Sequence, residues 1–158
     1  MMQGNQDLLK IPPMKPIHTP PEGLTSINLL GIPTIVRLHG RDTGGALSII
    51  ELCDKPGGGA PMHIHEREDE TFHVIEGEYE FTCGGETFIA KPGATVFGPR
   101  GIAHGYRYLG DTPGKLLLVV TPSGIEDWFA EVGELEEQTV PAVVELGKKY
   151  GLEFLPPD

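Results

Sequence analysis

The sequence is poor in basic residues and in cysteine. Its 158 residues include 12 Lys and Arg against 23 Asp and Glu, a net charge of −11 with neutral histidines. The basic residues form no block, which excludes nucleic acid and anionic membrane surfaces as partners, because both attract positive charge. The two cysteines, Cys53 and Cys83, are too few for a disulfide framework. This cysteine usage predicts a reducing, cytoplasmic environment.

Long apolar runs are missing as well. No stretch approaches the length of about 18 residues that a membrane-spanning helix needs. Residues 1–10 lack the basic start and apolar core of a signal peptide. We therefore expect neither membrane insertion nor secretion.

Glycine and proline are abundant, with 22 and 15 residues, and they separate short runs rich in β-branched side chains. Nine such runs predict strands, and turn signals between them leave no room for helices. The expected strands are residues 25–30, 34–39, 46–53, 71–75, 79–83, 87–90, 94–97, 104–109 and 116–121. The pattern predicts an all-β fold, a closed or double-sheet antiparallel barrel.

The two ends of the chain differ from this central barrel, which we expect over residues 24–122. Residues 1–23 contain five prolines and no periodicity, and they are interpreted as an extended N-terminal arm. Residues 123–158 are predicted to form a helical C-terminal tail that packs on the barrel.

Two amphipathic helices are expected in this tail. Ser123 is expected to cap the first, with Glu126 completing a capping box and Gly133 ending the helix. The second is expected over residues 140–150, with Pro141 near its start.

One stretch of the barrel carries groups that bind metals. His63 and His65 are two residues apart, so they project from the same face of a strand. Glu70 begins the next strand and shares a face with Phe72. If the histidines also face the interior, three ligands converge there, and His104 on another strand supplies a fourth. Such a set suits Fe, Mn, Ni, Co, Cu or Zn and does not suit calcium or magnesium.

Two longer patterns contain these ligands. They resemble the two motifs of the cupin superfamily, except that Tyr108 stands where the family usually has Asn. The patterns are Gly57-x5-His63-x-His65-x4-Glu70-x6-Gly77 and Gly93-x5-Pro99-x-Gly101-x2-His104. The resemblance implies a jelly-roll β-barrel that binds one divalent transition metal ion, and it implies a homodimer. The implied metal ligands are His63, His65, Glu70 and His104.

Several other side chains receive an expected position. Tyr106 and Tyr108 share the parity of His104, so they are candidates, with Phe72, to line a substrate pocket. Phe88 and Phe97 are expected in the core. Arg100 is interpreted as a turn residue or as an attractor of anionic substrates at the barrel mouth. Glu66, Glu68 and Asp69 are expected in a solvated turn, and Cys53 and Cys83 at buried strand positions. His73 is expected outside the cavity, and His18 and His39 are expected to be isolated surface residues.

The C-terminal residues also resemble those of single-domain cupins grouped near the quercetinases. This resemblance implies a metal-dependent dioxygenase whose small substrate is enolic or phenolic, like a flavonol or a diketone. It also implies that Glu70 acts as the catalytic base that takes the substrate proton. The alternatives are a non-redox enzyme, such as a decarboxylase or isomerase of an oxo acid or sugar, a binding module that holds a small molecule without transforming it, and a storage protein.

Overall fold

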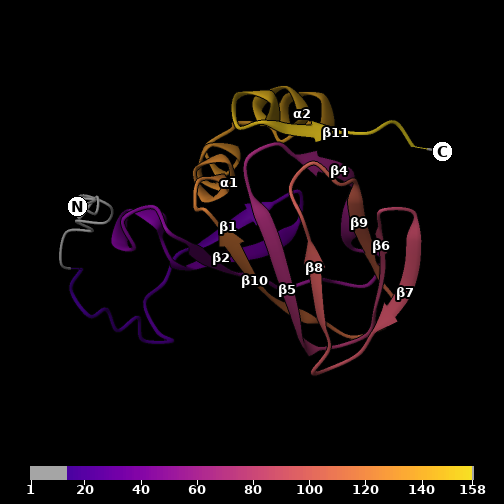
Figure 1. Ribbon diagram of the computed structural model, residues 1–158, viewed down its shortest axis with the longest axis horizontal. Helices are drawn as coiled ribbons and strands as arrows, with labels where there is room; N and C mark the ends of the chain where they lie inside the picture. The colour runs from indigo at the N-terminus through magenta and orange to yellow at the C-terminus, as the bar shows by residue number, and fades with distance from the viewer. Residues whose placement is uncertain (1–13, 158) are drawn as a thin grey trace, which may run out of the picture.

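Two antiparallel sheets face each other in the computed structural model, which describes residues 14–157 (Figure 1). The first sheet has the strand order β1-β2-β3-β10-β5-β8 and the second the order β11-β4-β9-β6-β7. Successive strands from β3 to β6 alternate between the sheets, which is the connectivity of a jelly roll. The expected all-β barrel with C-terminal helices is therefore confirmed.

The strands of the first sheet are β1 (Ser26–Leu29), β2 (Ile32–Leu38), β3 (Ser48–Leu52), β10 (Lys115–Thr121), β5 (Asp69–Glu76) and β8 (Thr95–Gly98). Those of the second are β11 (Leu152–Phe154), β4 (Gly59–His65), β9 (His104–Tyr108), β6 (Tyr79–Cys83) and β7 (Glu86–Ala90). All nine expected strands are present, with small differences at their ends, and β4 is the strand that the spacing of His63 and His65 implied. The short β11 was not expected, because three residues offer no alternation to detect. Its pairing with β4 brings the chain's tail into the second sheet.

The core lies between the sheets, where alternate residues of each strand point inward. Along β10 the buried residues are Leu116, Leu118 and Val120. Leu118 is paired in register with Phe72 on β5, and both side chains are almost fully buried. Burying a Leu or Phe of this kind contributes about 1.5–3 kcal/mol relative to leaving it exposed. This interior face also determines which residues of β5 point toward the site described below.

Two phenylalanines expected in the core lie at the surface. Phe97 is 57% exposed and Phe88 is 38% exposed. In β8 the inward positions are taken by Val96 and Gly98, so alternation turns Phe97 outward. Phe88 lies on β7, the edge strand of its sheet, and its ring stacks on Phe81. Both cysteines are partly exposed, not buried as expected, and neither forms a disulfide.

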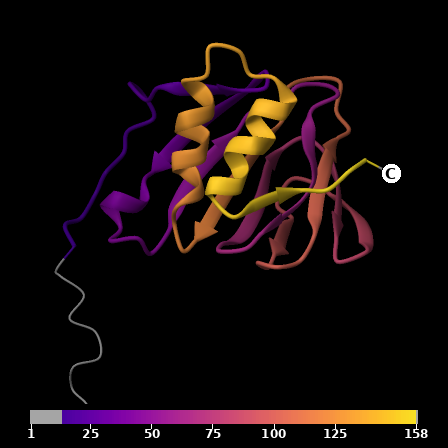
Figure 2. The same cartoon turned by 90° about the horizontal axis from the view of Figure 1, so that it is seen from above.

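The two helices lie side by side over the barrel (Figure 2). They are α1 (Ile125–Gly133) and α2 (Val140–Lys149). The side chain of Thr139 caps α2 by accepting from the Ala142 N–H, and Gly151 with φ +68° follows the helix. The expected end of the second helix is therefore confirmed to within a residue.

The expected cap of α1 is wrong. The N-cap is Gly124, which has no side chain, and not Ser123. Glu126 replaces the missing cap, because its carboxylate accepts from the N–H of Gly124 at 2.8 Å and from the N–H of Gly40 at 2.9 Å. The second bond ties the start of α1 to a short 3-10 helix, η1 (Gly40–Asp42).

His39 also belongs to this junction and is not an isolated surface residue. Its ring caps η1 by accepting from the N–H of Arg41. Its Nε2 atom lies 3.3 Å from a carboxylate oxygen of Asp127 on α1. His18, by contrast, is exposed as expected.

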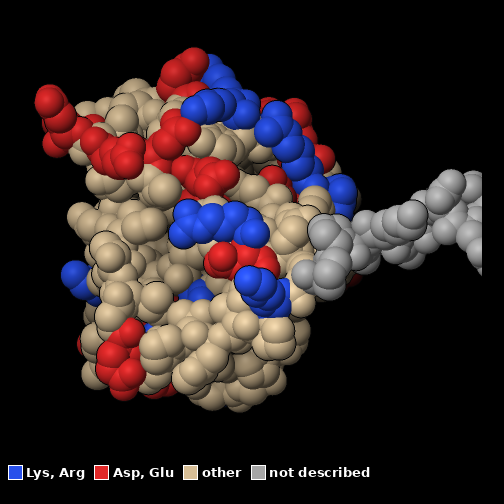
Figure 3. Space-filling model, turned by 90° about the vertical axis from the view of Figure 1, so that its left-hand side faces the viewer, with Lys and Arg blue, Asp and Glu red and all other residues tan. Residues whose placement is uncertain are grey.

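The ends and the surface complete the description. Residues 1–13 of the expected arm lie outside the described residues, and residues 14–23 form neither helix nor strand. No helix within residues 14–157 has the length and apolarity needed to span a membrane. On the face seen in Figure 3, acidic and basic side chains are interspersed.

Candidate metal centre and its cavity

Four buried side chains from three strands meet on the inner wall of the barrel. His63 and His65 come from β4, and His104 comes from the neighbouring β9, where it pairs in register with His63. Glu70 reaches the same point from β5 in the opposite sheet. One ligand atom from each of the four lies within 4.8 Å of all the others. The strand periodicity therefore brings together the four residues that the sequence singled out.

The three imidazoles are oriented by hydrogen bonds on their Nδ1 atoms. His63 Nδ1 donates to the carbonyl of Pro61 at 2.7 Å, and His104 Nδ1 donates to the carbonyl of Ile102 at 3.0 Å. His65 Nδ1 lies 3.4 Å from a carboxylate oxygen of Glu68. Because these partners only accept, each Nδ1 carries a hydrogen. A ring in its neutral form then has its lone pair at Nε2, and a protonated ring points its Nε2–H at Glu70.

The three Nε2 atoms converge on one carboxylate oxygen. Glu70 Oε2 lies 2.8 Å from His104 Nε2, 3.2 Å from His65 Nε2 and 3.6 Å from His63 Nε2. Three imidazole nitrogens and one carboxylate oxygen form a donor set for a divalent transition ion. The residues present therefore fit the metal that the sequence predicts, and its identity among Fe, Ni, Mn, Cu, Co and Zn stays open.

The charges at this cluster favour a cation. Burial alone would raise the pKa of the Glu70 carboxyl, but the charge of His65 and the imidazole hydrogen bonds hold it well below its usual value. Burial would lower the pKa of His65, but the negative charge of Glu70 raises it. Burial lowers the pKa of His63. Glu70 is therefore an ionised carboxylate inside a largely apolar barrel.

Glu68 is a member of this site that the sequence analysis missed. It was assigned to a solvated turn, yet it is only 3% exposed and contacts His65. The spacing of three residues after His65 was the available signal, but it became informative only once the turn between β4 and β5 was known. Asp69 is the first residue of β5 and not part of the turn, and it forms an ion pair with Arg100 at 3.0 Å. Arg100 is thus held by Asp69, while Glu66 is exposed as expected.

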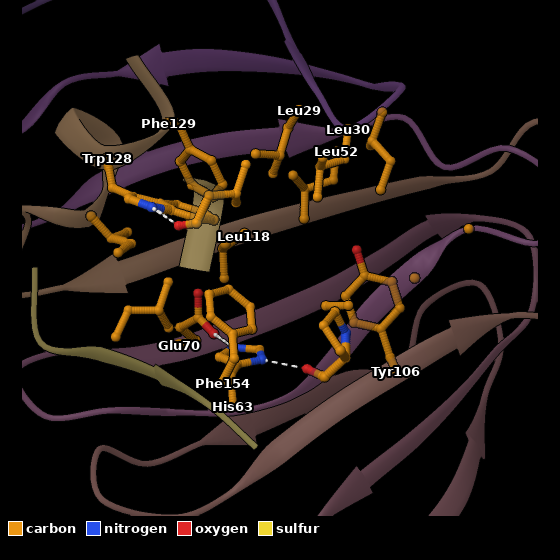
Figure 4. Close-up of a pocket in the computed structure, with 18 of the residues that line it drawn as sticks. Leu29, Leu30, Leu52, His63, Glu70, Tyr106, Leu118, Trp128, Phe129 and Phe154 are labelled. Carbon is orange, nitrogen blue, oxygen red and sulfur yellow. Dashed lines mark hydrogen bonds and ion pairs between the residues drawn. The ribbon is translucent and has the colours of Figure 1, made fainter. Parts of the chain in front are cut away.

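A cavity of about 400 Å³ opens beside the cluster (Figure 4). Both sheets and both helices contribute to its wall, and among the described residues no Lys or Arg lines it. In Figure 4, Trp128, Phe129, Leu29 and Leu30 follow one another along the upper side of the cavity, and Glu70 and His63 lie together below. The side chains with polar groups in the wall are His63, His65, Glu70, Tyr106 and Trp128, and the Trp128 indole N–H donates to the carbonyl of Val143.

The expected pocket residues divide into two groups. Phe72 and Tyr106 line the cavity, whereas Tyr108 does not. The Tyr108 hydroxyl donates to the carbonyl of Thr112 at 2.6 Å, and its ring packs on Tyr79. Strand alternation correctly predicted that Tyr108 lies on the same face of β9 as Tyr106. Tyr108 is two residues further along the strand, however, and the cavity ends before it. His73 lies outside the cavity, as expected, and contacts Thr95.

Tyr106 is connected to a fully buried carboxyl. Its hydroxyl donates to Asp54 at 3.2 Å, and the other carboxyl oxygen of Asp54 has no hydrogen-bond partner among the described residues. Burial raises the pKa of Asp54 to about 6, although the neighbouring tyrosine hydroxyls oppose the rise. Burial, followed by the charge of Asp54, raises the pKa of Tyr106 well above its usual value. Tyr106 therefore remains a neutral hydroxyl at the cavity wall.

Comparison with known proteins agrees with this geometry. Residues 51–120, which run from β3 to β10 and include all four ligands, match the cupin domain family. The barrel has the cupin jelly-roll fold.

Two curated relatives of the cupin domain match at the sequence level. Quercetin 2,3-dioxygenase of Bacillus subtilis is 33% identical over 72 residues, which cover 46% of this chain and 21% of that protein. Germin-like protein subfamily 2 member 2 of Arabidopsis thaliana is 30% identical over 115 residues, which cover 66% of this chain and 52% of that protein. The matched cupin region thus spans between a fifth and about half of these relatives.

Solved structures share the fold. The crystal structure of a predicted oxalate decarboxylase from Thermotoga maritima superposes with a TM-score of 0.61 at 21% identity, covering 67% of this chain and 99% of that one. At this identity the likeness shows that the cupin jelly roll is shared, and it carries no information on substrate.

Proposed function

We propose that this protein is a metal-dependent cupin dioxygenase. Its substrate is small and largely apolar, and it approaches the metal through one enolic or phenolic oxygen. The observation that supports this proposal is the convergence of three Nε2 atoms and the Glu70 carboxylate at the wall of an apolar cavity. The metal, held by His63, His65, Glu70 and His104, would supply Lewis acidity and the redox chemistry of oxygen.

The cavity wall favours this substrate class over a charged one. A small oxo acid or a sugar acid carries a carboxylate that is usually bound by Arg or Lys, and among the described residues neither lines the cavity. An apolar ring or chain fits the aliphatic and aromatic wall. Its polar atoms have two partners of suitable chemistry, the metal site and the Tyr106 hydroxyl.

Glu70 is proposed as the base that receives the proton of the substrate oxygen. Its carboxylate is ionised, buried and adjacent to the three Nε2 atoms, so a substrate oxygen near the metal is within reach of it. Tyr106 would orient the substrate by accepting a hydrogen bond, because its own hydroxyl hydrogen is donated to Asp54. The apolar wall excludes water from both groups.

The first test is metal content. Protein purified without a His tag or chelator should carry about one equivalent of a transition metal, and His104→Ala should lose most of it. His73→Ala is the matched control, because His73 lies on β5 outside the cavity and should not affect the metal. Protein that neither contains nor takes up metal would contradict the proposal and favour a binding module.

The second test is oxygen dependence. Flavonols and diketones are screened for oxygen uptake with the metal-loaded protein, and Glu70→Gln should retain part of the metal but lose turnover. Full activity of Glu70→Gln would exclude Glu70 as the base. Turnover that continues under nitrogen would contradict the dioxygenase proposal and would favour a non-redox reaction at the same site.

We also propose a cytoplasmic homodimer. The two free cysteines support a reducing compartment, and the homodimer rests on the likeness to cupins. Light scattering coupled to size-exclusion chromatography should give twice the mass of the 17.1 kDa chain. A mass equal to one chain would contradict the dimer.

A further inference from the structure

The turn between β1 and β2 has an unusual residue. Leu29 pairs with Ile32, so Leu30 and Gly31 alone connect the two strands. Their φ angles are +48° and +90°, as a type I′ turn requires. Leu30 is the one residue other than glycine with positive φ among those described. Asn, Asp and Gly favour this conformation, whereas the side chain of a leucine opposes it.

A side chain from the helical tail fixes this turn. Gln138 lies in the connection between α1 and α2, and its Oε1 atom accepts from the N–H of Leu30 at 2.8 Å. Its Nε2 atom donates to the carbonyls of Asn28 and Val132, at 2.6 and 3.0 Å. One amide thus joins the hairpin to the helices and holds Leu30 in its disfavoured backbone conformation.

The Leu30 side chain occupies the mouth of the cavity. It lines the cavity and is also 47% exposed. Val140, at the start of α2, also lines the cavity and is 64% exposed. In Figure 4, Leu30 lies with Leu29 and Leu52 on a different side of the cavity from His63 and Phe154. The wall is therefore polar at the metal site and apolar where it meets solvent.

We propose that Leu30 is a specificity-determining residue that selects ligands with an uncharged, apolar end at the cavity mouth. A turn that needed only to connect two strands would be served better by Asn or Gly at this position. The leucine supplies an apolar contact that these residues lack, and the Gln138 hydrogen bonds stabilise the turn that presents it. The inference rests on the proposed function in one respect, namely that a small molecule occupies the cavity.

A pair of fluorescent dyes tests this inference on the full chain. N-phenyl-1-naphthylamine is neutral, and 8-anilino-1-naphthalenesulfonate has the same rings with an added sulfonate. The wild-type protein should bind the neutral dye at least about tenfold more tightly, since among the described residues no Lys or Arg lines the cavity to pair with the sulfonate. Equal affinity for the two dyes, or no binding of the neutral one, would overturn the inference.

Substitutions at Leu30 separate side-chain contact from turn geometry. Leu30→Asn should weaken binding of the neutral dye about tenfold while the melting temperature stays the same or rises, because Asn tolerates positive φ. Leu30→Met should keep the affinity of the wild type. Leu109→Asn is the matched control, because Leu109 is 42% exposed and does not line the cavity.

The remaining outcomes are equally decisive. Unchanged dye affinity in Leu30→Asn, or an equal loss in Leu109→Asn, would overturn the role of Leu30. A lower melting temperature in Leu30→Asn would overturn the assignment of a strained leucine. Metal uptake is measured on the same samples. A protein that binds the dye but no metal contradicts the proposed function alone, and one that binds metal but no dye contradicts this inference alone.

Discussion

Tyr106 at the cavity wall donates its hydroxyl hydrogen to Asp54, a carboxyl that has no exposed surface at all. The two residues are 52 positions apart, and their contact places an ionisable group directly beneath the cavity. Tyr106 thus gives the wall a neutral hydroxyl away from the metal site, and the charge of the Asp54 carboxyl behind it depends on pH.

The pH dependence of stability should reveal Asp54. Its pKa is about 6 in the folded protein against an ordinary value of 3.8. The unfolded chain therefore loses this proton first, and the folded state is relatively favoured below pH 3.8 and loses that advantage as pH rises through about 6. Each pH unit of that interval corresponds to ~1.4 kcal/mol, so the total is about 3 kcal/mol.

Asp54→Asn removes this dependence. In urea unfolding, the stability of the variant minus that of the wild type should increase by up to about 3 kcal/mol between pH 4 and pH 7. Other titrating groups are common to both proteins and cancel in the difference. A difference that stays constant from pH 4 to pH 7 would show that Asp54 titrates normally.

Glu68 should act as a positioning residue for the metal. Its carboxylate contacts His65 Nδ1, and such partners fix the ring of a metal-binding histidine. Glu68→Ala should weaken binding of Ni²⁺ or Co²⁺ by roughly 10- to 100-fold in chelator competition. Glu68→Gln should lose less, because its amide oxygen still accepts. The exposed neighbour provides the control, and an equal loss in Glu66→Ala would contradict the role of Glu68.

Gly77 should be required for stability for two reasons: its backbone conformation, and the lack of space for a side chain. Its φ is +91°, and an added Cβ atom would lie 2.5 Å from the Tyr108 ring. Gly93 has almost the same φ of +90° but no atom within 4 Å of its added Cβ. Gly93→Ala should cost about 1–2 kcal/mol of unfolding free energy, and Gly77→Ala about 1–3 kcal/mol more because the ring must move. Similar losses in the two variants would refute the clash with Tyr108.

The interior of the first sheet should behave as a close-packed core. Leu116 has no exposed surface and lies on β10 between β3 and β5. Leu116→Ala should lower the free energy of unfolding by about 2–5 kcal/mol. Leu109→Ala, at an exposed position, should change it by no more than about 0.5 kcal/mol. A loss below 1 kcal/mol at Leu116, on the order of a surface substitution, would contradict its place in the core.

Local periodicity explains how much the sequence revealed. Side chains in a strand alternate with a period of two, so His63 and His65 had to share a face, and Glu70 had to share one with Phe72. Turn glycines marked the strand ends, and Pro141 marked the start of α2. The strands other than β11, the second helix and the four converging side chains were therefore predictable from near neighbours in the chain.

Contacts between distant segments of the chain determined the features that the sequence did not predict. Glu68 becomes buried only because the turn after β4 folds toward His65, and Tyr108 misses the cavity only because the cavity ends at Tyr106. Leu30 reaches the cavity mouth through a hydrogen bond to Gln138, 108 positions away. Alternation determines the face on which a residue lies, whereas the packing of sheets and helices decides what covers that face. The sequence by itself thus determined the four candidate metal-binding residues, and only the tertiary structure decided the shape and apolar character of the cavity beside them.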